Sequence, residues 1–257
     1  MNFEPNICYL LANMELIVTD NYQALSQVGA EMIAGVIRAQ PDAAVVLPTG
    51  DTPMGMYREL AEMKRRGELD ASNLRVFQLD EYLGITSDDP RSLYGWLARS
   101  LFEPLGIPDA NVVRLPGDAE DQVAACRAYD QVVEAAGGFD LVVLGLGPNG
   151  HLGFNEPPAD SHAPTRLVDL SEASIESSAR YWGDKNLVPC QAVTAGMVQL
   201  LGARRILLVV SGAHKREILH QTIAGPVTPN VPSSYLQRVS NITVIADRDA
   251  WPSKRDE

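Results

Sequence analysis

The amino-acid sequence predicts an α/β protein with a single doubly wound, mostly parallel sheet and helices on both faces of that sheet. Short apolar runs recur along the chain, and segments with a helical period lie between them, which is the alternation typical of this class. The 257 residues show no internal repeat and no low-complexity linker. With 46% hydrophobic and 21% charged residues, the chain can bury the core of one large domain.

The strands are predicted from apolar runs of the kind expected for parallel strands that are covered on both faces. The first strand begins at Met14, so we expect residues 14–257 to form one domain. Residues 1–13 are then an N-terminal extension, unless Met14 is the true start of the protein. In chain order, the runs are Leu16 to Val18, Ala43 to Leu47, Arg75 to Leu79, Val112 to Val113, Leu141 to Leu144, Ile206 to Val210 and Ile242 to Ala246.

The clearest helix is predicted between the first two strands, where apolar residues recur every three or four positions and form one stripe toward the sheet. Asp20 or Asn21 precedes this helix as a capping residue. Residues 119–136 and 215–223 show a similar period. Residues 157–190 contain prolines and serines without a long apolar period, which predicts either a lid over a neighbouring site or an ordinary surface excursion. The stripe of the first helix consists of Leu25, Val28, Met32, Ile33 and Val36.

Composition and charge argue against several classes of protein. No apolar run is long enough to span a bilayer, and the first residues lack the basic start and the apolar core of a secretory signal. A net charge of -12 argues against nucleic acid and anionic membranes as partners. Cys8, Cys126 and Cys190 are widely separated, which supports neither a disulfide framework nor a zinc site. We therefore expect a cytoplasmic protein without a metal centre.

Residues 145–157 hold the most informative polar side chains of the sequence, directly after a predicted strand. In an open α/β sheet, ligands bind in the crevice at the carboxyl ends of the strands. The glycines of this segment allow a sharp turn and a close approach to a ligand. His151, Glu156, Asn149 and Asn155 are its only polar side chains, so the chemistry that it supports is proton transfer or hydrogen bonding.

The loop after the second strand, Leu47 to Pro53, has the features of an anion site. Gly50 permits a turn, and Thr49 and Thr52 supply hydroxyls just before a helix whose N-terminal N–H groups and dipole attract phosphate. The glycine spacing and the lysine of a Walker loop are missing. The alternative is a tight turn with Thr52 as the N-cap of the helix. Asp51 opposes phosphate binding unless its side chain points away from the site.

Further loops are expected to bring an acid and two cations to the same sheet edge. Neighbouring residues that leave a strand point in different directions, so we expect Asp80 to face the crevice and Glu81 to cap or pair. Lys215 starts a helix after the sixth strand, where a cation suggests an anion held between the lysine and the helix. Arg180 is a candidate phosphate clamp in the possible lid. Each side chain alone is also typical of a solvated loop, and their convergence predicts the site.

Four motifs give the chain a family resemblance. They are Leu-Pro-Thr-Gly-Asp-Thr-Pro at 47–53, Leu-Asp-Glu-Tyr-Leu-Gly at 79–84, Asn-Gly-His-Leu-Gly-Phe-Asn-Glu-Pro at 149–157 and Val-Thr-Ala-Gly-Met at 193–197. On these motifs, residues 14–250 resemble the glucosamine-6-phosphate deaminase family, whose Rossmann-like fold the 6-phosphogluconolactonases share. The lactonases are a weaker match, because they resemble the third motif only at its Gly-His core and lack the Asp-Glu-Tyr sequence.

The resemblance implies that an amino-sugar 6-phosphate and water are converted to a ketose 6-phosphate and ammonia without a cofactor. It implies that Asp80 is the general base that moves the C2 proton of the opened sugar to C1. It implies that His151 is the acid/base that opens the sugar ring, while Glu156 orients the imidazole and favours its protonated form. Asn149 belongs to the same catalytic motif. The residues that match the phosphate-holding positions are Thr49, Gly50, Thr52, Arg180 and Lys215.

The sequence departs from the family pattern at three places. Asn149 stands where many members have aspartate, which removes one acid/base group. Asp51 stands where members usually have a small residue. Ala159, Asp160 and Val168 stand where the regulated hexameric members bind an acetylated sugar phosphate, so the resemblance implies a monomer or small homo-oligomer without that activation.

Three other functions stay open from the sequence. Galactosamine 6-phosphate presents the same C1, C2 and phosphate as its C4 epimer, so it is an alternative substrate. Lactone hydrolysis requires no C2 proton transfer and therefore no Asp80. Sugar-phosphate-sensing regulators have a related fold, but they normally add a DNA-binding helix-turn-helix, for which thirteen leading residues are too few.

Overall fold

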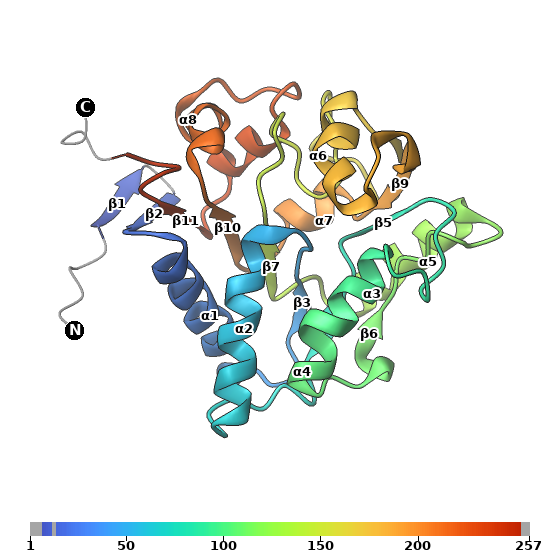
Figure 1. Cartoon of the computed structure of the whole chain (residues 1–257), viewed down its shortest axis with the longest axis horizontal. Coiled ribbons are helices and arrows are strands. Elements are labelled where there is room, and N and C mark those ends of the chain that lie inside the picture. Colours follow the sequence, from blue (N-terminus) through green and yellow to red (C-terminus); the bar gives the residue numbers. More distant parts are fainter. Residues whose placement is uncertain (1–6, 12–13, 253–257) are drawn as a thin grey trace.

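The computed structural model describes residues 7–11 and 14–252, and its architecture is a twisted sheet between two layers of helices (Figure 1). Within these residues, eight strands form the main sheet in the order β1-β2-β11-β10-β7-β3-β4-β6. All neighbours in this sheet are parallel except β1, which runs antiparallel to β2. The predicted fold class is therefore confirmed. The strands are β1 (Ile7–Leu11), β2 (Met14–Thr19), β3 (Ala44–Val46), β4 (Arg75–Phe77), β6 (Val112–Val113), β7 (Leu141–Leu144), β10 (Ile206–Val210) and β11 (Ile242–Asp247).

Of the predicted N-terminal extension, residues 7–11 form the edge strand β1, which pairs with β2 from Ile7 opposite Val18 to Leu11 opposite Met14. Residues 1–6 and 12–13 of that extension, and residues 253–257 of the predicted domain, lie outside the described residues.

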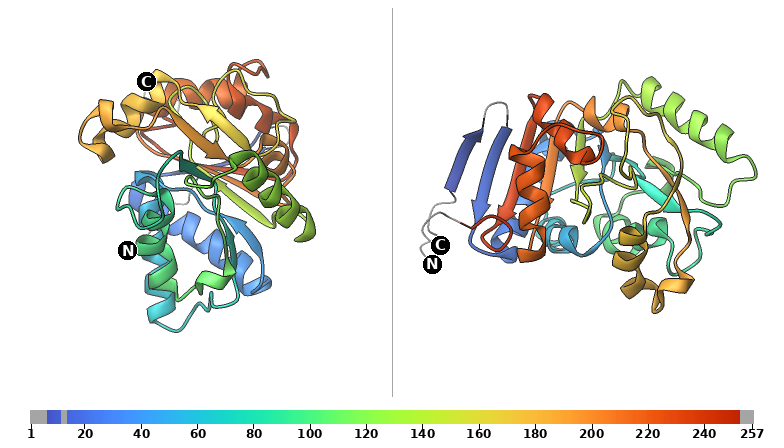
Figure 2. Two further views of the ribbon diagram at one scale, coloured as in Figure 1. Left: turned by 90° about the vertical axis from the view of Figure 1, so that its right-hand side faces the viewer. Right: turned by 90° about the horizontal axis from the view of Figure 1, so that it is seen from above.

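The helices cover both faces of the main sheet because each has one apolar stripe. Leu25, Met56 and Leu105 belong to a buried cluster on one face, which is covered by α1, α2 and α4. Tyr129 and Leu219 belong to the cluster on the other face, which is covered by α5, α7 and α8. Figure 2 shows these layers from two further directions. The helices are α1 (Tyr22–Ala39), α2 (Asp51–Arg65), α3 (Leu93–Leu97), α4 (Glu103–Leu105), α5 (Gln122–Ala135), α6 (Glu172–Trp182), α7 (Met197–Leu201) and α8 (Arg216–Ala224).

Shorter helical turns connect these elements. A π-helical turn, Ala98–Phe102, joins α3 to α4. Turns of 3-10 helix are found at Asp109–Asn111, Lys185–Leu187, Ala213–Lys215 and Pro232–Arg238.

Helix α1 shows how the sequence determines a boundary. Asn21, rather than Asp20, is the N-cap, and its side chain accepts a hydrogen bond from the N–H of Ala24 at 3.0 Å. Leu25 and Ile33 from the predicted stripe are fully buried. Within the described residues, no helix is both long enough and apolar enough to cross a membrane.

A second, antiparallel sheet of the described residues was not predicted. It contains β5 (Asp80–Tyr82), β9 (Gln191–Thr194) and β8 (Arg166–Asp169), in the order β5-β9-β8. Its strands have three or four residues, which is too short for a clear alternation of polar and apolar residues. The segment 157–190, which lacks a long apolar period, contains β8 and α6 of this region.

An aromatic cluster fixes α6 against the small sheet. The ring of Tyr82 on β5 contacts the rings of Trp182 and Phe154, with centroids 5.1 and 5.4 Å apart. Phe154 belongs to the loop after β7, so the same cluster attaches α6 to that loop. Figure 1 shows α6, β5 and β9 beside one another.

Candidate active site

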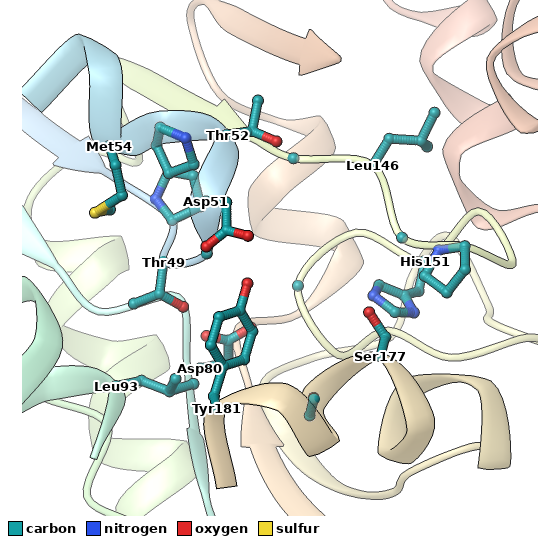
Figure 3. A pocket seen from close by; sticks show the side chains of 18 of the residues that line it. Thr49, Asp51, Thr52, Met54, Asp80, Leu93, Leu146, His151, Ser177 and Tyr181 are labelled. Carbon is teal, nitrogen blue, oxygen red and sulfur yellow. The ribbon is translucent and has the colours of Figure 1, made fainter. Parts of the chain in front are cut away.

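A cleft of about 880 Å³ opens at the carboxyl edge of the main sheet, and Figure 3 shows part of its lining. It lies between the loops that follow β3, β4, β7 and β10, with α6 along one side, because parallel strands bring these loops to a common edge. Of the predicted site residues, only Asn149 and Glu156 do not line it. The predicted residues that do are Asp80, His151, Thr49, Gly50, Thr52, Arg180 and Lys215.

The loop after β3 leads into the N-terminus of α2. Gly50 is the N-cap of this helix and has φ 96°, a left-handed conformation that favours glycine. Thr52 lies inside the helix, so the alternative in which Thr52 is the N-cap is wrong. The first N–H groups of a helix have no partner within it, and together with the helix dipole they attract an anion. This end of the cleft can therefore bind a phosphate.

The side chain of Asp51 does not point away from the cleft but forms an ion pair with Arg180. The Arg180 Nη1 atom lies 2.9 Å from Asp51 Oδ2, and both side chains are about 60% exposed. Arg180 also stacks over the ring of Tyr181, which in turn contacts the ring of Trp96 with centroids 4.8 Å apart. The cation at the end of α6 is thus held over the start of α2 by a carboxylate and an aromatic ring.

Lys215 supplies a second cation at the same end of the cleft. It closes the 3-10 turn after β10, and its Nζ donates to the carbonyl oxygen of Leu146 at 2.6 Å. Burial, and then the charge of Arg180, lower the pKa of Lys215 to about 8. A bound anion would favour the charged lysine.

Asp80 and Glu81 follow one another but have different surroundings. Asp80 lines the cleft and is only 7% exposed, and burial, followed by the charge of Glu81, raises its pKa to about 8. The carboxylate of Glu81 instead accepts hydrogen bonds from the N–H groups of Leu93 and Tyr94, at 2.9 and 3.0 Å. Ser92 also donates to Glu81, at 2.9 Å. Glu81 therefore anchors the start of α3, and Asp80 is the carboxyl group available to a ligand.

His151 is supported from behind by a buried carboxylate. Its Nδ1 lies 3.4 Å from Glu156 Oε2, and Asn149 Nδ2 donates to the same oxygen at 2.7 Å. Burial raises the pKa of Glu156, but the hydrogen bond and charge of His151 and hydrogen bonds from Ser174 and Asn149 outweigh it and lower that pKa to about 2. Glu156 is therefore ionised at neutral pH.

Gly147 provides the space that the imidazole occupies. A Cβ atom at position 147 would lie 2.2 Å from Cδ2 and 2.3 Å from Nε2 of His151. Any other residue there would displace the ring, so this glycine is required by a close approach rather than by a turn.

Two serines at the start of α6 contact this cluster and were missed from the sequence. Ser171 is the N-cap of α6 and its Oγ accepts from Asn149 Nδ2 at 3.1 Å. Ser174 donates from Oγ to Glu156 and lies 3.2 Å from His151 Nδ1. The sequence Ser171-Glu-Ala-Ser174 resembles a helix start, which was the only available signal for them.

The arrangement combines a carboxyl group that titrates near neutral pH, an imidazole backed by a carboxylate, and an anion site with two cations. Such a cleft can hold a phosphorylated substrate by one end and move protons at the other. Within the described residues, no three His, Cys, Asp or Glu side chains are grouped to hold a metal ion.

Comparisons with known proteins agree in one family. Residues 19–245 match the family of glucosamine-6-phosphate isomerases and 6-phosphogluconolactonases. A glucosamine-6-phosphate deaminase of Clostridium botulinum is 38% identical over 238 residues, which are 92% of this chain and 97% of the relative. A glucosamine-6-phosphate deaminase of Thermoanaerobacter is 39% identical over 244 residues, which are 95% of this chain and 96% of the relative.

Solved structures show the same likeness. The structure of a monomeric glucosamine-6-phosphate deaminase is 36% identical with a TM-score of 0.89, covering 91% of this chain and 98% of that protein. A 6-phosphogluconolactonase from Leishmania guyanensis has a TM-score of 0.72 at 19% identity, covering 93% of this chain and 98% of that protein, and shares the fold alone.

Proposed function

The chain belongs to the family of glucosamine-6-phosphate isomerases and 6-phosphogluconolactonases, and on this basis we propose that it is an isomerising deaminase. Its reaction converts glucosamine 6-phosphate and water to fructose 6-phosphate and ammonia. The relatives that are 38% and 39% identical over more than nine tenths of the chain are named for this activity, which supports the proposal.

One observation supports this reaction above others: Asp80 lines the same cleft as His151 and has a pKa raised to about 8. Removing a proton from the carbon next to an aldehyde requires a base whose pKa lies near the working pH. In our proposal, Asp80 takes the C2 proton of the open-chain sugar, and a 1,2-enolamine forms when O1 gains a proton from solvent water. Asp80 then returns its proton to C1, which leaves an iminium ion at C2. Water adds to that carbon and releases one proton, which replaces the one taken from solvent. The proton of the new hydroxyl passes to nitrogen, the C–N bond breaks, and ammonia leaves as the C2 carbonyl forms.

His151 acts in the preceding step, in which the pyranose ring opens. It transfers the proton of the C1 hydroxyl to the ring oxygen, so that the C1–O5 bond breaks and the aldehyde forms. Glu156 and Asn149 lie behind the imidazole and hold it in place. Glu156 Oε2 lies 3.4 Å from Nδ1 of His151, and Asn149 Oδ1 accepts a hydrogen bond from the backbone N–H of His151 at 3.2 Å. Every step moves protons, water or ammonia, so the reaction itself consumes no redox cofactor.

The phosphate belongs at the other end of the cleft. There Gly50 and Thr52 lie at the N-terminus of α2, with Thr49 just before it, and Arg180 and Lys215 supply the cations. These local charges offset the net charge of -12, which disfavours the approach of an anion to the protein as a whole.

The proposed reaction is tested by giving the protein three compounds separately and measuring the release of ammonia and of acid. We expect ammonia from glucosamine 6-phosphate. The rate with galactosamine 6-phosphate determines the preference at C4. No ammonia from either amino sugar contradicts the proposal, and release of acid from 6-phosphogluconolactone alone would identify a lactonase.

We also infer that the protein acts as a monomer or small homo-oligomer and is not activated by N-acetylglucosamine 6-phosphate. Ala159 and Val168 have no polar side-chain atom with which to bind such an activator, and the solved relative at 36% identity is described as monomeric. Light scattering during gel filtration, with and without the acetylated sugar phosphate, tests this inference. We likewise propose that residues 14–257 form a single domain and that residues 157–190 act as a lid over its cleft.

A further inference from the structure

Ser174 is a buried polar residue that the proposed reaction does not use. It is the third residue of α6 and only 2% exposed, and it is not among the described residues that line the cleft. A serine inside a helix usually points to solvent or donates to a carbonyl oxygen of its own helix. The Oγ atom of Ser174 instead contacts Glu156, His151 and Ser171.

The hydrogen atoms of this cluster have one consistent arrangement. A serine hydroxyl has one hydrogen to donate and two lone pairs. Glu156 is ionised and can only accept, so it receives the hydrogen of Ser174. Ser171 Oγ accepts from Asn149 Nδ2 at 3.1 Å and from the N–H of Ser174 at 3.2 Å, a donor that it shares with the carbonyl oxygen of Ser171 at 3.0 Å. The hydrogen of Ser171 therefore goes to Ser174 Oγ, 3.2 Å away.

One lone pair of Ser174 is then left, and it faces Nδ1 of His151 at 3.2 Å. The other neighbour of Nδ1 is Glu156 Oε2, at 3.4 Å, which is also an acceptor. The backbone N–H of His151 donates to Asn149 Oδ1 at 3.2 Å, which sets the amide so that Nδ2, and not Oδ1, faces Glu156. With the hydrogens placed in this way, Nδ1 faces only acceptors among the described residues, so we assign a hydrogen to Nδ1 itself.

The opposite ring nitrogen has different surroundings. Among the described residues, Nε2 of His151 has no hydrogen-bond partner, and the side chain lines the cleft, as Figure 3 shows. A neutral imidazole with its hydrogen on Nδ1 presents the lone pair of Nε2 to a ligand.

We propose that Ser174 is a positioning residue that keeps a hydrogen on Nδ1 of His151 and thereby reserves Nε2 for proton exchange with the substrate. This inference deepens the proposed function and rests on it for the identity of the reaction. In that reaction, Nε2 takes the proton of the C1 hydroxyl and gives it to the ring oxygen. Glu156 alone would hold Nδ1 through one longer contact, whereas Ser174 supplies a second acceptor and fixes the carboxylate itself.

Heteronuclear NMR of isotope-labelled imidazole groups tests this proposal, because it distinguishes the two neutral tautomers without substrate. The signals of His151 are assigned by comparison with His151→Gln. We expect the Nδ1–H tautomer in the wild-type protein and a mixture with Nε2–H in Ser174→Ala. In turnover, Ser174→Ala should lower kcat about tenfold to a hundredfold, the loss expected for one hydrogen bond to a charged group, with KM changed less than about threefold.

Ser174→Thr keeps the hydroxyl and should restore the Nδ1–H tautomer and most of kcat. Glu172→Gln, an exposed change in the same helix, is the control and should leave both unaltered. An Nε2–H tautomer in the wild-type protein overturns the proposal, even where Ser174→Ala fails to fold. So does a Ser174→Ala variant with the wild-type tautomer and kcat. Since the tautomer is observed in the resting protein, absence of deamination would contradict the proposed function without deciding the role of Ser174.

Discussion

The two ends of the cleft satisfy their polar groups in different ways. One end of the cleft contains His151, and we call it the proton-transfer end after its proposed role. There the imidazole, Glu156 and Asn149 bind one another within a buried cluster. The other end contains Arg180 and Lys215, and we call it the anion end; its two cations bind groups that a phosphate could replace. Arg180 pairs with the exposed carboxylate of Asp51, and Lys215 donates to a single backbone carbonyl.

This difference indicates how each end responds to a ligand. In the proposed reaction, the buried cluster transfers protons in the arrangement that it already has, so we expect substrate binding to require little rearrangement there. The proposed phosphate would instead displace the internal partners of Arg180 and Lys215, and we expect the cost of that exchange to enter the binding constant. We therefore expect substitutions near His151 and Asp80 to change kcat, and substitutions near Arg180 and Lys215 to change KM.

The largest effect is expected from Asp80→Asn. An amide cannot accept the C2 proton, so kcat should fall about a hundredfold to ten-thousandfold, which is the usual contribution of a general base. Exchange of the C2 proton with solvent, followed by NMR in deuterated water, should be lost, while KM changes little. Retained exchange would assign the base to another residue and remove Asp80 from the proton-transfer end.

The same substitution should change stability in a pH-dependent way. The pKa of Asp80 is about 8 in the folded protein against a usual value of 3.8, so the folded state holds a proton that the unfolded chain has lost. Stability therefore falls as the pH rises from about 4 to about 8, and Asn avoids this loss. The difference in Tm between Asp80→Asn and the wild-type protein should grow over that range. A constant difference would show that Asp80 is ionised throughout.

The second largest effect is expected from Lys215→Met, which removes a cation from the anion end. Loss of a charge-assisted hydrogen bond to phosphate should raise KM about tenfold to a hundredfold, with a smaller change in kcat. Because the pKa of Lys215 is about 8, the wild-type KM should also rise above that pH, whereas the KM of the variant should not. The control is Lys185→Met, at an exposed lysine that pairs with Glu172. A fall in kcat alone would place Lys215 with the proton-transfer end.

A smaller effect is expected from Asn149→Asp, which places a second carboxylate against Glu156, where Nδ2 now donates at 2.7 Å. Two carboxylates at this separation share a proton, so the pKa of the pair should rise above the value of about 2 found for Glu156. We expect kcat at neutral pH to fall by about tenfold or less and the pH profile to gain an ionisation. On acidification, the stability that ionised Glu156 contributes should therefore be lost at a higher pH in the variant than in the wild-type protein. An unchanged pH profile would contradict the network.

The smallest effect is expected from Asp51→Ser. Exposed ion pairs contribute little, so freeing Arg180 should lower KM only about twofold to fivefold. The effect should shrink as salt is added, because salt screens the competition between Asp51 and phosphate. Asp70→Ser removes a similarly exposed aspartate, paired with Lys64 away from the cleft, and should leave KM unchanged. A higher KM in Asp51→Ser would mean that Asp51 helps to bind the substrate.

The parts predicted from the sequence are those that depend on local pattern. Apolar runs located the parallel strands, and the carboxyl ends of those strands placed Asp80, His151 and Lys215 near one edge. The second sheet was missed because its short strands show no periodicity. Glu81 was expected only to cap or pair, since its partners on α3 lie about a dozen residues away.

The other site features that were not predicted from the sequence depend on contacts between distant segments. Ser171 and Ser174 belong to the site only because α6 folds back on the loop after β7, and nothing in their own sequence indicates that loop as a partner. The pairing of Asp51 with Arg180 likewise joins segments more than a hundred residues apart. The sequence showed Asp51 as an obstacle to phosphate, and only the structure shows which cation it engages.

The contact between Trp96 and Tyr181 gives the protein an internal optical signal. The indole ring packs on a residue at the end of α6, and its Nε1 donates to the sulfur of Met54 on α2 at 3.3 Å. Emission from an indole depends on the polarity and quenching groups around it. Because Arg180 stacks on Tyr181, we expect a ligand that separates Arg180 from Asp51 to alter the surroundings of Trp96, so that a change in intrinsic fluorescence would report occupancy of the cleft without a dye.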